Sequence, residues 1–145
     1  MRVMSSFCSA LIMGRILSPL VKNQIVRVVV CGYGQRGEYL AKRLAGEKWC
    51  RVVAVADPSP AALQRATSLR QVSTFDDFGK LLAATDADVA AICTPRHLLH
   101  EHGAAAMEAG LQVLLAQAPE KRLDGATILE PEPYFLARWR AALRK

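Results

Sequence analysis

Residues 26–57 have the pattern of a strand, a glycine-rich turn, a helix and a second strand that ends in an acid. The β-branched run Val26–Cys31 is typical of a strand buried on both faces. Gly34–Ala45 has the spacing of a helix, and Arg51–Ala56 is a second short run of Val and Ala that stops at Asp57. A tight turn between a buried strand and a helix is how a parallel α/β sheet begins, so this segment strongly limits the folds available to the chain.

Strand and helix patterns continue to alternate as far as residue 115. Their connections are too long for hairpins and favour right-handed crossovers between parallel strands. We therefore expect an α/β fold, a Rossmann-type doubly wound parallel sheet of about five strands with no second domain. The further elements expected are helix Pro60–Leu69, strand Val72–Thr74, helix Asp76–Ala84, strand Asp88–Cys93, helix His97–Ala109 and strand Leu111–Leu115.

The length of 145 residues suits one hydrophobic core. We expect residues 26–118 to form a nucleotide-binding domain and residues 119–145 a loop and a short basic helix, whose apolar stripe is a docking face. Residues 1–25 are interpreted as an extension, with a targeting segment as the alternative. Their apolar run, Phe7–Met13, is too short to span a bilayer. We expect a cytoplasmic protein without a membrane segment.

The net charge of +6 does not by itself indicate nucleic-acid binding. The basic excess lies near the two ends of the chain, and no aromatic and basic platform accompanies it, so we expect no nucleic-acid partner. The cysteines form no C-x-x-C pair, and no histidine stands at metal-finger spacing. We therefore expect reduced, buried thiols and no metal site; the cysteines are Cys8, Cys31, Cys50 and Cys93.

The turn has the spacing Gly-x-Gly-x-x-Gly. Gly32 allows a tight turn, Gly34 lets the backbone approach a pyrophosphate, and Gly37 lets the helix pack close to the strand. The helix N-terminus then offers N–H groups and partial positive charge to the phosphates. This pattern predicts dinucleotide binding, and a turn without a ligand is the alternative. The expected cradle is Gly32, Tyr33, Gly34, Gln35, Arg36 and Gly37.

Asp57 stands where a carboxylate can accept hydrogen bonds from the adenosine ribose. Because it would repel a 2′-phosphate, we expect NAD as the cofactor rather than NADP. Arg36 and Arg65 are the residues that could reach an added phosphate and weaken this preference. The alternative is that Asp57 only forms a turn with Pro58.

Thr94, Pro95 and His97 follow the fourth expected strand, at the edge where ligands of open α/β sheets bind. We expect them beside the nicotinamide half of the cofactor, with a helix-start role as the alternative for His97. His100 and His102 are expected at the surface. No Ser–His–Asp arrangement is evident, so the catalytic residues are unknown.

The residues quoted above resemble the Gfo/Idh/MocA family of NAD(P)-dependent sugar and inositol oxidoreductases over about Val26 to Leu115. The shared features are the glycine turn, Ala54–Asp57, Asp86–Val89, Cys93–Leu98 and Ala106–Leu114. The resemblance implies a Glu-Lys-Pro signature after the fifth strand, whose lysine contributes to cofactor placement and catalysis.

This chain departs from that pattern. Ala116–Ala118 stand at the signature, so Gln117 replaces the lysine unless an insertion brings Lys121 there. Arg96 replaces the usual Asn, and Leu99 stands where His is common. No residues match the family's substrate domain.

Three functions stay open. The first is a cofactor-binding domain without autonomous catalysis, either a stand-alone module or a truncated relative. The second is a dehydrogenase of sugars or polyols that works with a partner subunit, and the third is a nucleotide-sensing or interaction module. The edge of the fifth strand is expected to be exposed and to promote self-association or binding of a partner subunit.

Overall fold

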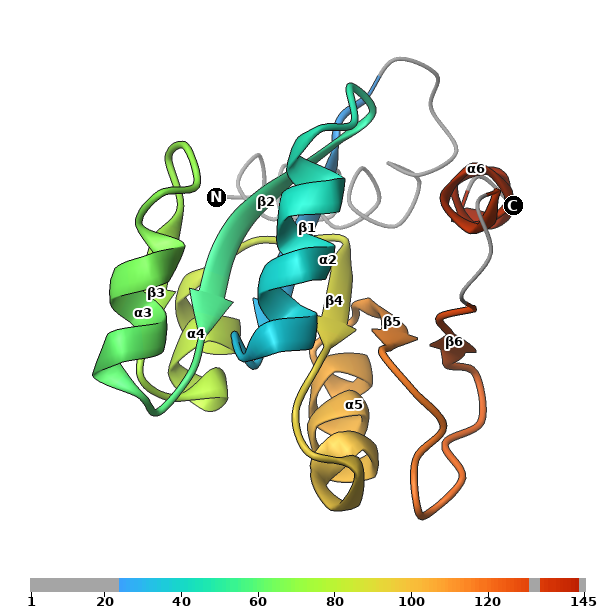
Figure 1. Cartoon of the computed structure of the whole chain (residues 1–145). Helices are drawn as coiled ribbons and strands as arrows, with labels where there is room; N and C mark the ends of the chain where they lie inside the picture. The colour runs from blue at the N-terminus through green and yellow to red at the C-terminus, as the bar shows by residue number, and fades with distance from the viewer. Residues whose placement is uncertain (1–23, 131–133, 144–145) are drawn as a thin grey trace, which may run out of the picture.

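The computed structural model describes residues 24–130 and 134–143, in which one parallel sheet is covered by helices on both faces (Figure 1). In chain order the elements are β1 (Val26–Cys31), α2 (Gln35–Ala45), β2 (Cys50–Ala56), α3 (Pro60–Ala66), β3 (Ser73–Phe75), α4 (Phe78–Ala84), β4 (Val89–Ile92), the 3₁₀ turn η2 (Arg96–Leu98), α5 (Leu99–Glu108), β5 (Gln112–Leu115), β6 (Thr127–Ile128) and α6 (Phe135–Leu143).

The strand order is β3-β2-β1-β4-β5-β6, and every neighbouring pair is parallel. This confirms the expected α/β class with its doubly wound sheet. The order reverses between β1 and β4, because the chain first crosses outward through β2 and β3 and then returns to pair β4 with β1. Such a switch point leaves a crevice beyond the carboxyl ends of the two central strands.

The core has two layers, one on each face of the sheet. Val28 and Val30 of β1 pack with residues of α2 and α3, whereas Val29 and Cys31 pack with residues of α4 and α5. This alternation is the period of two that a strand imposes. Figure 1 shows α2 lying across the front of the central strands.

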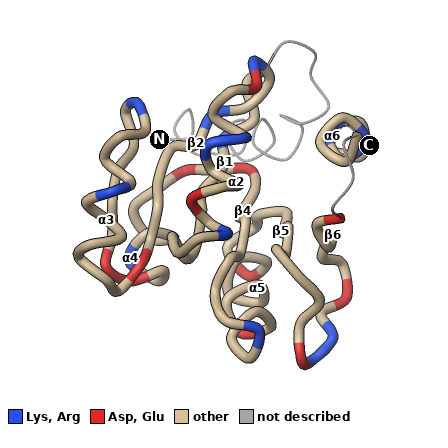
Figure 2. The backbone as a smooth tube through the Cα atoms, in the orientation of Figure 1, with Lys and Arg blue, Asp and Glu red and all other residues tan. Residues whose placement is uncertain are grey.

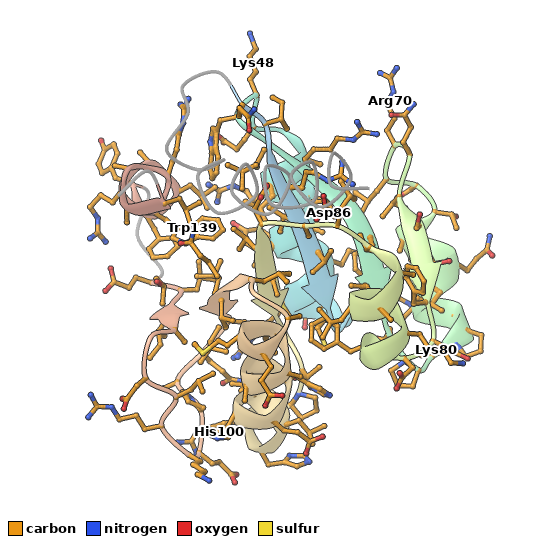
Figure 3. The ribbon with its side chains drawn as sticks, turned by 180° about the vertical axis from the view of Figure 1, so that it is seen from behind. Lys48, Arg70, Lys80, Asp86, His100 and Trp139 are labelled. Atoms are coloured by element: carbon orange, nitrogen blue, oxygen red, sulfur yellow. The ribbon has the colours of Figure 1, made fainter. Side chains whose placement is uncertain are left out.

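The C-terminal helix belongs to the first of these layers. Phe135, Trp139 and Leu143 are buried within it, so the apolar stripe of α6 docks onto the chain's own core. Trp139 meets the edge of Trp49 with ring centroids 5.9 Å apart. Figure 3 shows Trp139 on α6, at the side of the sheet.

The sixth strand was not expected from the sequence. Leu114 and Leu115 of β5 pair with Thr127 and Ile128 of β6, and the Leu129 N–H donates to the Leu115 carbonyl at 2.8 Å. The expectation that β5 forms an exposed edge is therefore wrong for these last residues of the strand. The fold leaves β3 and β6 as the edges of the described sheet, and self-association stays a prediction.

Charges on the described residues do not gather on one face. Figure 2 shows Lys and Arg interspersed with Asp and Glu over several elements. Within residues 24–130 and 134–143, no helix has the length and apolarity to cross a membrane. Apart from its last two residues, the extension assigned to 1–25 lies outside the described part, so its interpretation stays a prediction.

Candidate dinucleotide-binding site

A cavity of about 700 Å³ lies beyond the carboxyl ends of β1, β2 and β4. The glycine turn and the start of α2 form one end, and the residues that follow β4 and β5 form the other. The lining residues are Cys31, Gly32, Gly34, Gln35, Arg36, Ala56, Asp57, Pro58, Asp76, Asp77, Phe78, Cys93, Thr94, Pro95, Leu98, His102 and Gln117.

Two of the three glycines are required by the fold itself. Gly32 has φ +94°, and a Cβ there would lie 2.8 Å from the Cys93 carbonyl oxygen. At Gly37 a Cβ would lie 1.9 Å from the Gly32 carbonyl oxygen, so α2 approaches the turn as closely as the backbone permits. These two glycines bring the helix start against the strand end.

Gly34 differs from both. Among the described residues, no atom beyond Gly34 and its two chain neighbours lies within 4 Å of the position that a Cβ would occupy there, and its φ of −77° suits any residue. Gly34 lines the cavity and is the N-cap of α2, yet no side chain in the described part of the chain caps the helix. The first N–H groups of a helix have no partner within the helix, so they are available to an anion.

Asp57 binds the glycine turn as well as facing the cavity. Its Oδ2 accepts the Tyr33 N–H at 2.7 Å, and its Oδ1 accepts the Ser59 N–H at 2.8 Å. The turn-forming role considered from the sequence is thus present. Each carboxylate oxygen can accept more than one hydrogen bond, so the carboxylate also retains capacity toward a ligand in the cavity.

Tyr33, expected in the cradle, contributes its backbone only. Its side chain is fully buried in the core and does not line the cavity. Arg65 extends from α3 to the turn and donates to the Tyr33 carbonyl at 3.0 Å. Its Nε lies 3.3 Å from Oε1 of Glu38 on α2.

The other end of the cavity is formed by side chains. Thr94 Oγ1 lies 3.0 Å from His102 Nδ1, and the His102 ring meets the Phe78 ring edge-on at 5.8 Å. His102, expected at the surface, is instead partly buried and lines the cavity, because α5 turns this residue toward Thr94. Gln117 follows β5 and also lines the cavity.

Two residues weighed from the sequence lie away from this cavity. His97 is exposed on η2, and Lys121 is exposed in the loop after β5; neither lines the cavity. That loop is tied to α5, because His100 Nδ1 lies 3.0 Å from the Arg122 carbonyl oxygen. Figure 3 shows His100 at the start of α5 beside this loop.

Burial makes the described thiols poor nucleophiles. Cys31, Cys50 and Cys93 are free. Burial raises the pKa of Cys93 and of Cys50 to about 12, and it raises the pKa of Cys31 further. They are protonated at neutral pH. Among the residues that the structure describes, no group of three or more His, Cys, Asp or Glu side chains could hold a metal ion.

Comparison with known proteins identifies the family. A model described as an oxidoreductase family with an NAD-binding Rossmann fold, GFO_IDH_MocA, matches residues 26–117. The chain belongs to the Gfo/Idh/MocA oxidoreductase family. The match ends at Gln117, so it covers both ends of the cavity.

Individual members of the Gfo/Idh/MocA family match the same region. D-glucoside 3-dehydrogenase of Escherichia coli is 30% identical over 100 residues, which are 65% of this chain and 27% of that protein. A glycosyl hydrolase family 109 protein of Streptomyces coelicolor is 29% identical over 102 residues, 63% of this chain and 22% of that protein. The chain thus spans about a quarter of the length of these relatives.

The fold is shared with solved structures. The WlbA dehydrogenase of Chromobacterium violaceum, in complex with NADH and UDP-GlcNAcA, has a TM-score of 0.63 and 26% identity. The match covers 67% of this chain and 28% of that one. The cavity fits a dinucleotide, because the open side of Gly34 leaves room for a pyrophosphate against the N-terminus of α2.

Proposed function

We propose that this chain binds NAD(H) in the cavity and does not transfer hydride by itself. The adenosine ribose would lie against Asp57 and the pyrophosphate against Gly34. The nicotinamide half would lie toward Thr94 and Gln117. Bound NAD supplies a hydride acceptor, while the protein supplies binding and orientation.

The observation that carries binding is the contrast among the three glycines. Gly32 and Gly37 are needed to close the backbone, whereas nothing within the described chain excludes a side chain at Gly34. The chain has room for a side chain at Gly34, yet the residue is glycine. A ligand that occupies this room explains the glycine. The uncapped N–H groups beside it suit phosphate oxygens.

Charge near the ribose favours NAD over NADP. Asp57 lines the cavity, and with the ribose against it the carboxylate would face an added 2′-phosphate. Arg65 is already engaged by the Tyr33 carbonyl and by Glu38. A repulsion of even 1.4 kcal/mol corresponds to a factor of about ten in affinity.

The absence of autonomous hydride transfer is proposed from the side chain after β5. Hydride transfer requires a base within reach of the substrate hydroxyl. Gln117 lies in the cavity where the family resemblance implies a lysine, and an amide does not accept that proton. Lys121 lies outside the cavity.

His102 favours a second candidate, a dehydrogenase completed by a partner subunit. It is the histidine that lines the cavity, and an imidazole is the commonest general base. Its Nδ1 is engaged by Thr94, which would leave Nε2 to exchange a proton. In that case the partner would supply the substrate pocket.

Titration calorimetry with NAD⁺ and NADP⁺ tests the binding. We expect NAD⁺ to bind at least about tenfold more tightly. Gly34→Ala should lower NAD⁺ affinity by at least about tenfold without unfolding the chain, because its Cβ meets only the ligand. Equal affinities would remove the specificity argument, and unchanged NAD⁺ binding in Gly34→Ala would remove this site.

Turnover is a separate test. The purified chain, incubated with NAD⁺ and a panel of sugars and polyols, should form no NADH. NADH formation that His102→Asn abolishes would overturn the non-catalytic proposal and support the second candidate. His97→Asn is the matched control, because His97 is exposed and does not line the cavity.

A further inference from the structure

We propose that Arg65 is a positioning residue for the phosphate-binding turn, and that Arg65 and Asp57 fix the two peptide units that flank Tyr33. This inference rests on the proposed NAD(H) binding, which it deepens. Arg65 lies outside the glycine motif and does not line the cavity. It acts through the backbone of the turn.

The part of the turn whose orientation must be fixed consists of the two peptide units around Tyr33. Tyr33 lies between Gly32 and Gly34, and glycine has more backbone freedom than any other residue. The Tyr33 ring is fully buried in the core, which anchors the side chain. Burial of the ring does not by itself fix the rotation of the peptide units on either side.

Asp57 fixes the first peptide unit, which joins Gly32 to Tyr33. It accepts the Tyr33 N–H at 2.7 Å. In a trans peptide the carbonyl points opposite to the N–H, and the described chain has no cis bonds. The Gly32 carbonyl therefore points away from Asp57, toward the place where a Cβ on Gly37 would lie 1.9 Å from its oxygen.

Arg65 fixes the second peptide unit, which joins Tyr33 to Gly34. Its Nη2 donates to the Tyr33 carbonyl at 3.0 Å. By the same trans geometry, the Gly34 N–H points away from Arg65. Gly34 lines the cavity, so the orientation of this N–H determines what the turn offers a phosphate.

Arg65 is itself held by charge. Its Nε lies 3.3 Å from Glu38 Oε1, and Glu38 Oε2 lies 3.0 Å from Lys42 Nζ. The planar guanidinium can donate to a carbonyl and a carboxylate at once, which a lysine cannot do in the same geometry. The Arg65 side chain is 47% exposed, so this ion pair adds little to global stability.

The test begins with the ligand-free chain. ¹⁵N relaxation would measure the order parameter of the Gly34 N–H in the parent chain, in Arg65→Met and in the control Arg43→Met. Arg43 is exposed on α2 and donates to Tyr39 rather than to the turn. We expect the order parameter to fall from about 0.85 to below about 0.6 in Arg65→Met alone, with Arg65→Lys between the two.

Binding provides the second readout. Arg65→Met should weaken NAD⁺ and ADP by about tenfold, as expected for a lost hydrogen bond that orients a phosphate donor. Binding of adenosine, which lacks phosphate, should change less than about twofold. Arg43→Met should leave all three unchanged.

The outcomes separate this inference from the proposed function. An unchanged Gly34 order parameter in Arg65→Met overturns the positioning role, and so does a loss of order throughout the chain. If the parent chain does not bind NAD⁺ but Gly34 still loosens in Arg65→Met, the proposed function fails and the role of Arg65 in the turn holds.

Discussion

The two ends of the cavity are built by different means. At the turn end, backbone groups determine the shape, because Gly32 and Gly37 allow contacts that any Cβ would prevent. At the other end, the surface depends on the side chains of Thr94, His102 and Gln117. The difference teaches that the capacity to bind a dinucleotide depends on where side chains are absent. The capacity for chemistry depends on which side chains are present.

The largest expected effect comes from comparing two glycine variants. Gly37→Ala places a Cβ 1.9 Å from a backbone oxygen, which no side-chain movement relieves, so unfolding free energy should fall by about 3 kcal/mol or more. The Cβ of Gly34→Ala meets no atom of the described chain beyond its immediate neighbours, so this change should cost at most about 1 kcal/mol, the difference between two N-cap residues. Urea denaturation followed by circular dichroism measures both. Similar losses for the two variants would refute the division of roles.

A second test concerns the buried ring of Tyr33. Its hydroxyl has no hydrogen-bond partner among the described residues, and burial raises the pKa of this phenol. Tyr33→Phe removes an unsatisfied polar group, so stability should rise by about 1 kcal/mol. NAD⁺ affinity should stay within about twofold of the parent, because only the Tyr33 backbone serves the turn. A loss of stability in denaturation would show that the hydroxyl has a partner.

A third test concerns the end of the cavity that is formed by side chains. Thr94→Val preserves shape but removes the hydroxyl that lies 3.0 Å from His102 Nδ1. We expect a loss of about 1 kcal/mol in stability and less than about a threefold change in NAD⁺ affinity. Thermal melts and calorimetry measure the two effects. A loss of affinity as large as that of Gly34→Ala would place the main binding determinants at this end instead.

These expectations also show what the sequence could predict. The strand Val26–Cys31 has the predicted bounds, and most other elements differ by a few residues at their ends. Long apolar runs and the glycine spacing reflect what the backbone needs to form strands and the turn. These needs are local in sequence, so the sequence predicts these elements. β6 was missed because two residues, Thr127 and Ile128, are too few to show a period.

The side-chain end of the cavity was less predictable. His97 lies on η2, between β4 and α5, and is exposed, whereas His102 reaches the cavity from the first turn of α5. Phe78, at the start of α4, belongs to the core and also lines the cavity. Which side of a helix faces a cavity depends on the packing of that helix. No motif in the sequence encodes the rotation of a helix about its own axis.

The smallest expected effect is a dependence of stability on pH that belongs to the turn end. The hydrogen bond from Lys42 lowers the pKa of Glu38 from its ordinary value of 4.5, with Arg65 adding to the effect. Because the folded-state pKa lies below the unfolded one, this stabilisation is present above about pH 4.5 and is lost as the pH falls through the folded value. Denaturant midpoints of the parent chain and Glu38→Gln, compared from pH 6 downward, should therefore converge in acid. Lys42→Met should reduce the difference, since it removes the main cause of the shift. If the two curves stay parallel, Glu38 does not hold Arg65 through its charge, and the restraint on the turn must come from the Tyr33 carbonyl alone.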